Sequence, residues 1–280
     1  MDSSAPIGVF DSGLGGLSVL KTMYELLPSE SFIYVGDHRY LPYGDKSNAQ
    51  ILDRSFAISD FLIQNNAKAL VIACNTATAV AVNEMRRKIQ LPIIAMEPAV
   101  KPAISHSNSG KIGVLATAGT LDSYRFADLI QRLSDGAQII TQACSGLVEA
   151  IERAGPTAAY TQEMVGRYTD ALLKQNVDTI VLGCTHYSFV RSAVEKLAGK
   201  NVRVLDAGPA VAQQLARRLA DRQLLAKQPL AERVQFYTSS DPCAVRQSVG
   251  RLWGVDSTVQ KLPEQYCHDN INPDEELNHA

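Results

Sequence analysis

The sequence of 280 residues has no excess of charge of either sign, and this excludes some classes of partner. Lysine and arginine together number 27 and aspartate and glutamate 29, so the net charge is −2 when histidine is neutral. A protein whose main partner is nucleic acid or an anionic membrane usually carries a clear basic excess. We therefore expect a protein that binds no nucleic acid and no membrane.

Long apolar runs are missing as well. Gln64, Asn65, Asn66 and Lys68 interrupt the most apolar stretch before it reaches the roughly 20 residues that a membrane-spanning helix needs. The opening segment Met1–Pro6 is short and polar, unlike a secretory signal. These features predict a cytoplasmic protein.

Cysteine is scarce and lacks the spacing of structural sites. The five cysteines include no Cys-x-x-Cys pair, and their odd number does not suit a disulfide framework. The closely spaced ligand pairs of zinc sites are absent, and the sequence contains no motif for a bound cofactor. We expect all five thiols to be reduced and the protein to use neither metal nor cofactor.

What the sequence does contain is a regular alternation of short apolar runs with helical patterns. In a chain of this length the alternation predicts mostly parallel sheets whose two faces are covered by helices. The expected strands are Ile7–Phe10, Phe32–Val35, Ala69–Ala73, Pro92–Ala95, Lys111–Leu115, Gln138–Thr141, Thr179–Leu182, Val202–Asp206 and Val234–Thr238.

The pattern repeats once along the chain. Ile7-Gly8-Val9 matches Ile112-Gly113-Val114 at an offset of 105 residues, and Cys74 matches Cys184 at an offset of 110. Two similar offsets indicate an internal duplication. We therefore expect an α/β fold of two pseudo-symmetric parallel-sheet α/β domains that face each other across a cleft.

Two proline-containing segments, Glu97–Pro102 and Asp206–Pro209, have the composition of crossings between such domains. They predict a first domain of residues 1–98 plus 208–265 and a second domain of residues 99–207. The polar segment 266–280 is expected to be a frayed tail.

Cys74 and Cys184 end equivalent apolar runs, and each is followed by small polar residues and a helical pattern. Ligands of open α/β sheets bind at the carboxyl ends of the strands, so both thiols should face the cleft. A lone buried cysteine is usually a small hydrophobic residue, but two at matching positions suggest that one removes a proton while the other delivers one. The helix start after each cysteine favours the thiolate. We expect Cys144, Cys243 and Cys267, which have no matching partner, to be packing or surface residues.

The glycine-rich segment Asp11–Ser18 follows the first strand and leaves three interpretations open. It departs from a dinucleotide-binding turn because Ser18 occupies the position of the third glycine, although Asp37 lies at a suitable distance for a ribose. It could be a tight turn only. The interpretation that we favour is a turn whose backbone N–H groups hold a small carboxylate, with Asp11 facing the cleft as an acid/base partner or ammonium ligand.

His186 follows Cys184 by two residues, so both side chains can reach the cleft from one turn. His186 would then exchange a proton with the Cys184 thiol; its alternative role is to cap the turn. Glu149, near Glu152 at the start of a helical pattern, is either an ordinary solvated carboxylate or a support for His186.

Further polar and turn residues stand at the same strand ends and are expected to line the substrate site. Turn formation or helix capping would also explain them. They are Ser12, Pro42, Tyr43, Gly44, Asn75, Thr76, Thr117, Thr120 and Thr185.

Together these segments resemble the glutamate racemase family along nearly the whole chain. The similar segments are Phe10–Leu17, Gly36–Gly44, Ala73–Ala77 and Gly183–Tyr187, and the two that contain cysteine are the specific ones. The resemblance implies a cofactor-independent isomerase that interconverts L- and D-glutamate and supplies D-glutamate for bacterial peptidoglycan. We also expect a homodimer.

By the same resemblance, Cys74 and Cys184 are the two acid/base residues, and Glu149 matches the helper carboxylate of the family. The residues implied to bind substrate or to assist the thiols are Asp11, Ser12, Tyr43, Gly44, Asn75, Thr76, Thr185 and His186.

Two alternatives stay open. The same scaffold carries racemases of aspartate or hydantoins and decarboxylases with one thiol, and the presence of both cysteines argues against the decarboxylases. The other alternative is a two-lobed module that binds an amino acid without converting it. The paired thiols and the lack of a recognisable secretory signal weaken it.

Overall fold

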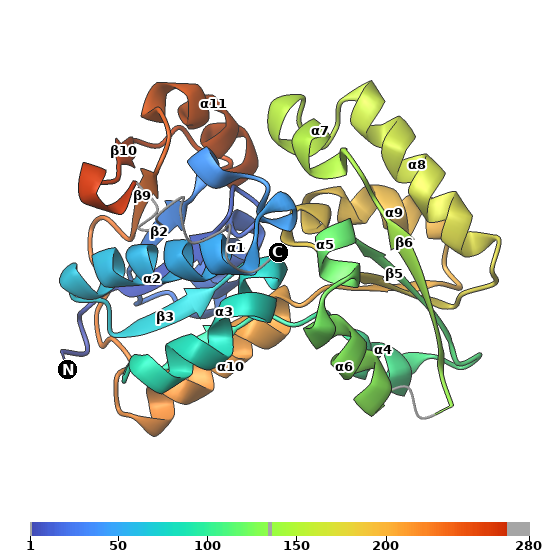
Figure 1. Cartoon of the computed structure of the whole chain (residues 1–280), viewed down its shortest axis with the longest axis horizontal. Coiled ribbons are helices and arrows are strands. Elements are labelled where there is room, and N and C mark those ends of the chain that lie inside the picture. Colours follow the sequence, from blue (N-terminus) through green and yellow to red (C-terminus); the bar gives the residue numbers. More distant parts are fainter. Residues whose placement is uncertain (1, 134–135, 268–280) are drawn as a thin grey trace, which may run out of the picture.

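The computed structural model describes residues 2–133 and 136–267 and shows two lobes that lie side by side (Figure 1). Each lobe is built around one parallel sheet, which confirms the expected fold class. Among the described residues, the first sheet has six strands in the order β10-β9-β2-β1-β3-β4, and the second has four in the order β6-β5-β7-β8.

The elements follow one another along the chain in alternation. The strands are β1 (Ile7–Asp11), β2 (Phe32–Gly36), β3 (Ala69–Ile72), β4 (Ile93–Ala95), β5 (Lys111–Ala116), β6 (Gln138–Ala143), β7 (Thr179–Leu182), β8 (Arg203–Leu205), β9 (Val234–Thr238) and β10 (Val259–Lys261). The α-helices are α1 (Leu17–Leu26), α2 (Asn48–Gln64), α3 (Asn75–Lys88), α4 (Val100–His106), α5 (Ala118–Leu121), α6 (Tyr124–Leu133), α7 (Leu147–Arg153), α8 (Ala159–Leu173), α9 (Arg191–Ala198), α10 (Gly208–Asp221) and α11 (Pro242–Trp253). The 3-10 helices are η1 (His38–Tyr40), η2 (Tyr43–Asp45), η3 (Thr185–Val190) and η4 (Glu264–Tyr266).

The strand order supports the internal duplication. The run β2-β1-β3-β4 in the first sheet corresponds to β6-β5-β7-β8 in the second. In each run the first strand in sequence lies beside the third, with Phe10 opposite Ile72 in one lobe and Leu115 opposite Leu182 in the other. Since the third strand of each run leads to a cysteine, the two thiols occupy corresponding ends of two sheets.

Helices cover both faces of the six-stranded sheet, as its continuous apolar strands require. On β1, Ile7 and Val9 belong to the core that contains α1 and α10, whereas Phe10 belongs to a second core with α2 and α3. Successive side chains of a strand point to opposite faces. The apolar run of β1 therefore fills two cores at once.

Gly8 and Gly113 occupy equivalent positions in β1 and β5 and let a helix approach the sheet closely. A Cβ on Gly8 would lie 2.9 Å from Cδ1 of Leu62 in α2, and one on Gly113 would lie 2.7 Å from Cδ1 of Leu172 in α8. In each lobe this helix precedes the third strand of the run. The two halves therefore share a packing detail as well as a strand order.

The two lobes are joined by a continuous apolar core. Leu17 of α1 and Tyr187 of η3 both belong to it. Beside them, Ser18 Oγ donates a hydrogen bond to the carbonyl oxygen of Thr185 at 3.0 Å. The core and this bond fix the turn after β1 against the turn after β7.

Some elements differ from the sequence-based expectation. The helix expected over Phe189–Leu197 begins earlier, as the 3-10 helix η3, and continues as α9. The sequence patterns did not predict α4, which is seven residues long with Pro102 inside it, or the three-residue edge strand β10. Such short elements carry too few residues to show a hydrophobic period.

The tail expected over residues 266–280 is not frayed at its start, because Tyr266 and Cys267 are buried. The Tyr266 ring packs edge-on against Phe61 with 5.5 Å between ring centroids. The backbone carbonyl oxygen of Tyr266 accepts a hydrogen bond from Arg54 Nη2 at 2.7 Å. Residues 268–280 of the expected tail lie outside the described residues. None of the described helices is long and apolar enough to cross a membrane.

The close packing of Gly113 against Leu172 predicts that Gly113→Val destabilises the fold. Because Leu172 is buried, the added side chain must force it aside, and overpacking of this kind typically costs about 1–3 kcal/mol. Urea unfolding followed by circular dichroism measures the effect. Gly166→Ala in α8 is the control, since a Cβ there meets no atom of the described residues within 4 Å, and it should not lower the unfolding free energy. Equal stability of Gly113→Val and the unaltered protein would contradict the packing argument.

Candidate active site

A cavity of about 250 Å³ lies between the two lobes, at the carboxyl ends of the strands of both sheets. Its walls come from the loops and turns after β1, β2 and β3 in one lobe and after β5, β6 and β7 in the other. Every residue that the sequence placed at the site lines it. These residues are Asp11, Ser12, Pro42, Tyr43, Gly44, Cys74, Asn75, Thr76, Thr117, Thr120, Glu149, Cys184, Thr185 and His186. Their chemical roles stay predictions.

The sequence did not single out eight further lining residues. They are Leu41, Asp45, Ala118, Gly119, Cys144, Ser145, Gly146 and Val148. Cys144, expected to be a packing or surface residue, is buried at the cavity wall, where its thiol donates a hydrogen bond to the carbonyl oxygen of Gln142 at 3.5 Å. It is a third thiol at the cavity, but its position after β6 has no cysteine counterpart in the other lobe.

Cys74 is itself the N-terminal cap of α3, a role expected of Asn75 or Thr76. The N–H of Ala77 donates to its sulfur at 3.4 Å, and the thiol donates to Ser12 Oγ at 3.7 Å. A helix start favours the thiolate, yet burial and the nearby Asp11 carboxylate raise the pKa of Cys74 to about 12. The N–H of Ala77 at the helix start does favour the thiolate, as expected, but burial outweighs it, so Cys74 is a thiol at neutral pH.

Asp11 is a buried carboxylate that the first turn holds in place. Its Oδ1 accepts a hydrogen bond from the Ser12 N–H at 2.8 Å, and its Oδ2 accepts one from the Gly16 N–H at 2.6 Å. Burial raises the pKa of Asp11, although His186 and these N–H groups act in the opposite direction. These two N–H groups of the turn bind the chain's own Asp11, and the binding of a small carboxylate ligand by the turn stays a prediction.

Cys184 stands at the end of a chain of polar contacts that runs through His186 to Glu152. The Cys184 sulfur lies 3.8 Å from Nδ1 of His186, and Nε2 of His186 donates a hydrogen bond to Oε1 of Glu152 at 2.7 Å. Burial alone would lower the pKa of His186, but its bonds to Cys184 and Glu152 raise it well above the ordinary value. The imidazole is thereby suited to hold a proton beside the sulfur.

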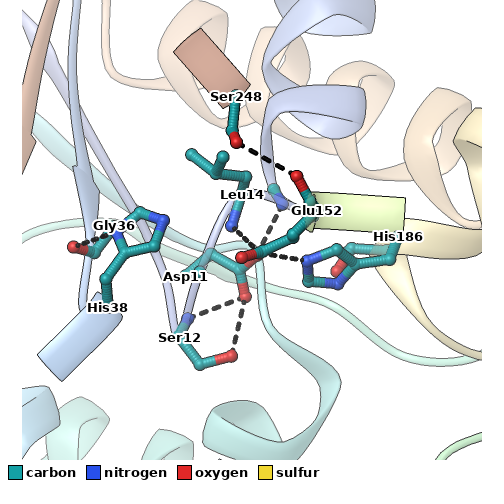
Figure 2. Close-up of polar contacts among 12 residues, drawn as sticks. Asp11, Ser12, Leu14, Gly36, His38, Glu152, His186 and Ser248 are labelled. Atoms are coloured by element: carbon teal, nitrogen blue, oxygen red, sulfur yellow. Dashed lines mark hydrogen bonds and ion pairs between the residues drawn. The ribbon is translucent and has the colours of Figure 1, made fainter. Parts of the chain in front are cut away.

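Glu152 also makes hydrogen bonds to the other lobe. Its Oε1 accepts a second hydrogen bond from the N–H of Leu14 at 2.8 Å (Figure 2). Its backbone carbonyl oxygen accepts one from Ser248 Oγ at 3.0 Å. Burial alone would raise the pKa of Glu152, but His186 lowers it. Glu152 is therefore an ionised carboxylate held by both lobes.

Glu149 is not the carboxylate that supports His186, contrary to the expectation. Both glutamates belong to α7, three residues apart, but Glu152 makes the bond to His186 while Glu149 lines the cavity wall. Residues at this spacing lie on neighbouring positions of one helix surface. The helical pattern of the sequence is therefore compatible with either glutamate as the partner of His186. The rotation of α7 about its axis determines that Glu152 makes the contact.

The wall that carries Tyr43 is held by a buried ion pair. The Tyr43 hydroxyl donates to Oδ2 of Asp37 at 2.6 Å, and Arg54 Nε donates to the same oxygen at 3.0 Å. Asp37 and Arg54 are 0% and 1% exposed. Asp37 is therefore a structural partner in this wall and does not face the cavity as a ribose ligand would.

Gly15 explains part of the glycine-rich turn. A Cβ at this position would collide with Thr185 Oγ1 and His186 Nδ1 of the other lobe. The glycine is needed for the close approach of the two lobes, so the turn does not require the dinucleotide interpretation. Within residues 2–133 and 136–267, no group of three or more His, Cys, Asp or Glu side chains is arranged to hold a metal ion.

Two α/β lobes each bring one thiol to a shared cavity, with the Asp11 carboxylate near Cys74 and the His186 imidazole beside Cys184. This fold and this pair of thiols are those of an amino-acid racemase class. The chain belongs to the Asp/Glu/hydantoin racemase family, whose pattern matches residues 7–215. It is 49% identical over 260 residues to a glutamate racemase of Pseudomonas paraeruginosa, covering 92% of this chain and 98% of that protein.

Solved structures are similar over the same length. Glutamate racemase RacE1 of Bacillus anthracis superimposes with a TM-score of 0.84 at 31% identity, covering 94% of this chain and 99% of that one. The glutamate racemase of Francisella tularensis, solved in complex with D-glutamate, gives a TM-score of 0.80 at 28% identity, covering 94% and 98%.

The repulsion between Asp11 and the Cys74 thiolate predicts that Asp11→Asn lowers the pKa of Cys74. The thiolate fraction then rises at a given pH, so iodoacetamide should alkylate Cys74 faster at about pH 9. Peptide mass spectrometry measures the rate at Cys74 alone. Asp45→Asn is the control, because Asp45 lines the cavity but is exposed and should leave this rate unchanged. An unchanged rate in Asp11→Asn would show that the carboxylate does not act on the thiol.

The contact between Glu152 and His186 predicts that Glu152→Gln lowers the pKa of His186, since a neutral amide no longer stabilises the imidazolium. An NMR titration of the histidine ring protons reports the change. Glu149→Gln should leave the pKa of His186 near its original value, because Glu149 makes no hydrogen bond to His186 within the described residues. If Glu149→Gln had the larger effect, the assignment of Glu152 would be wrong.

Proposed function

We infer that the protein interconverts L- and D-glutamate by removing the α-proton on one face of the carbon and delivering a proton on the other. The observation that carries this inference is the pair of cysteines at corresponding strand ends of two lobes, both lining one cavity. Inversion needs proton-transfer groups on opposite faces of one carbon, and two lobes that meet at a cavity supply them. The relative at 49% identity is a glutamate racemase, which favours glutamate as the substrate.

The cavity suits a small, highly charged substrate. Its volume of about 250 Å³ is below the range typical of drug-sized ligands. Hydroxyl groups of Ser12, Thr117 and Thr185 are donors that can hold carboxylates. The related structure from Francisella tularensis holds D-glutamate, which has two carboxylates and one ammonium group.

We propose that Asn75 binds the ammonium group. Its Nδ2 donates to the carbonyl oxygen of Gly183 at 3.0 Å, so the side-chain orientation is fixed. Its Oδ1 is buried and has no hydrogen-bond partner in the described part of the chain. Because a buried acceptor without a partner is costly, a donor from the substrate would satisfy it. Asp11 lines the same cavity and is the alternative ammonium ligand if it does not take the proton of Cys74.

In the proposed reaction, the thiolate of one cysteine takes the α-proton while the thiol of the other donates its own proton to the opposite face. The high pKa of Cys74 makes its thiolate a strong base once formed, and Asp11 is the nearby group that can accept the thiol proton. On the other side His186 serves Cys184, with Glu152 behind it. We propose that Cys74 acts on D-glutamate and Cys184 on L-glutamate.

Three further proposals follow from the sequence and its relatives. The product D-glutamate would serve peptidoglycan synthesis, and the protein would act in the cytoplasm, where its free cysteines stay reduced. We also propose a homodimer. Gel filtration with light scattering tests the last proposal, and a monomer at working concentration would refute it.

A circular-dichroism assay of the purified protein with L-glutamate, without added cofactor, tests the proposed function. The optical signal should decay as D-glutamate forms, and L-aspartate should react far more slowly. Cys74→Ser and Cys184→Ser should each lower turnover by about 10²-fold or more, because each removes one acid/base group. Cys243→Ser is the control, since Cys243 is exposed and does not line the cavity.

Three outcomes would contradict the proposal. If both cysteine variants keep the ability to invert glutamate, a two-thiol reaction is excluded. Binding of glutamate without any decay of the optical signal would favour the alternative of a binding module, and faster reaction of aspartate would identify a racemase of another amino acid.

A further inference from the structure

A contact between two glycines from different lobes closes one side of the cavity. Gly44 belongs to η2 and Gly119 to α5, and both line the cavity. A Cβ on Gly119 would lie 2.8 Å from Cα of Gly44 and 3.0 Å from its carbonyl oxygen. The two backbones therefore meet with no side chain between them.

This contact stands where the cavity meets solvent. Gly44 and Ala118, the residue before Gly119, are exposed, whereas Cys74, Cys184 and His186 are buried. All five line the same cavity. The glycine contact is thus part of the rim, and a shift of η2 away from α5 would widen the opening above the thiols.

Neighbouring residues hold the backbone on both sides of the contact. Tyr43, next to Gly44, donates its hydroxyl proton to Asp37 at 2.6 Å. Thr117 caps α5, because its Oγ1 accepts a hydrogen bond from the N–H of Thr120 at 3.3 Å. Each glycine therefore lies in a short helix that a neighbouring hydrogen bond holds in place. We expect an added side chain to push the lobes apart more readily than it would deform either helix.

The local structure of α5 does not itself require glycine at position 119. Gly119 is not among the residues with positive φ, and it stands inside a helix. A helix position of this kind favours alanine over glycine. The close approach of the Gly44 backbone accounts for the glycine.

We propose that the contact between Gly44 and Gly119 closes the cavity over bound substrate, and that Gly119 is a positioning residue because its missing side chain lets the lobes meet. The proposal rests on the proposed racemisation. A thiol that has taken the α-proton must keep it from solvent for the short life of the intermediate, and closure also excludes water from the charges that develop. Closure further holds the two thiols at the distance that one carbon requires.

Gly119→Ala tests the proposal. The added Cβ should keep the rim open, so kcat/KM should fall by about 10²-fold in both directions. With protiated L-glutamate in D₂O, the substrate recovered at low conversion should contain more deuterium than with the unaltered protein, because the abstracted proton exchanges before it returns. Gly166→Ala, where the Cβ meets no atom within 4 Å in the part of the chain that the structure describes, should match the unaltered protein in both measurements.

Thiol labelling tests the closure without any need for turnover. In Gly119→Ala, iodoacetamide should label Cys74 and Cys184 faster relative to the exposed Cys243, which serves as the internal reference. Gly44→Ala is a matched variant for this measurement. Its Cβ would lie 3.9 Å from Gly119, an ordinary contact, and should leave the labelling ratio unchanged.

A measurement on the unaltered protein covers the case in which Gly119→Ala does not fold. Hydrogen–deuterium exchange of the amides of η2 and α5 should slow when glutamate is added at saturation. Unchanged exchange in these two segments would overturn the proposal. So would a folded Gly119→Ala with unchanged labelling ratio and unchanged deuterium content, even if its turnover fell. If labelling rises but the unaltered protein does not racemise glutamate, the closure stands and the proposed function fails.

Discussion

The carboxylate of Glu152 is the contact on which the geometry of the site depends. It accepts hydrogen bonds from His186 in its own lobe and from the Leu14 N–H in the other. Leu14 belongs to the turn that also carries Asp11 and Ser12, which surround Cys74. One buried charge thus links the group beside one thiol to the turn beside the other. Hydrogen bonds to charged groups typically contribute about 1.5–3 kcal/mol, enough to align two lobes whose shared core is apolar and non-directional.

The duplicated fold produces a symmetric placement of the thiols but an asymmetric chemistry around them. Cys74 has a carboxylate, Asp11, nearby, whereas Cys184 has the imidazole of His186 at 3.8 Å. Burial raises the pKa of Cys74 to about 12, while the contacts with Cys184 and Glu152 together outweigh burial and raise the pKa of His186. At neutral pH Cys74 is therefore a thiol, and Asp11 is the group proposed to take its proton. Sheet topology accounts for the positions of the thiols, and local charge accounts for their different surroundings.

Much of this architecture could be predicted from the sequence, because apolar runs mark buried parallel strands and the carboxyl ends of such strands share one edge. That rule placed Asp11, Cys74 and Cys184 at one cavity. It could not choose between Glu149 and Glu152, since both lie on one side of α7 and only the packing of that helix sets its rotation. The approach of Gly119 to Gly44 depends on how the two lobes dock, which leaves no periodic signal in the sequence.

In the proposed reaction two thiols flank one carbon atom, and a crystal structure of the protein with bound D-glutamate measures this geometry. We expect the sulfur atoms of Cys74 and Cys184 to lie on opposite sides of Cα, each within about 3.5 Å of it. A structure in which only one sulfur reaches Cα, or in which both approach it from the same side, would rule out the two-thiol reaction.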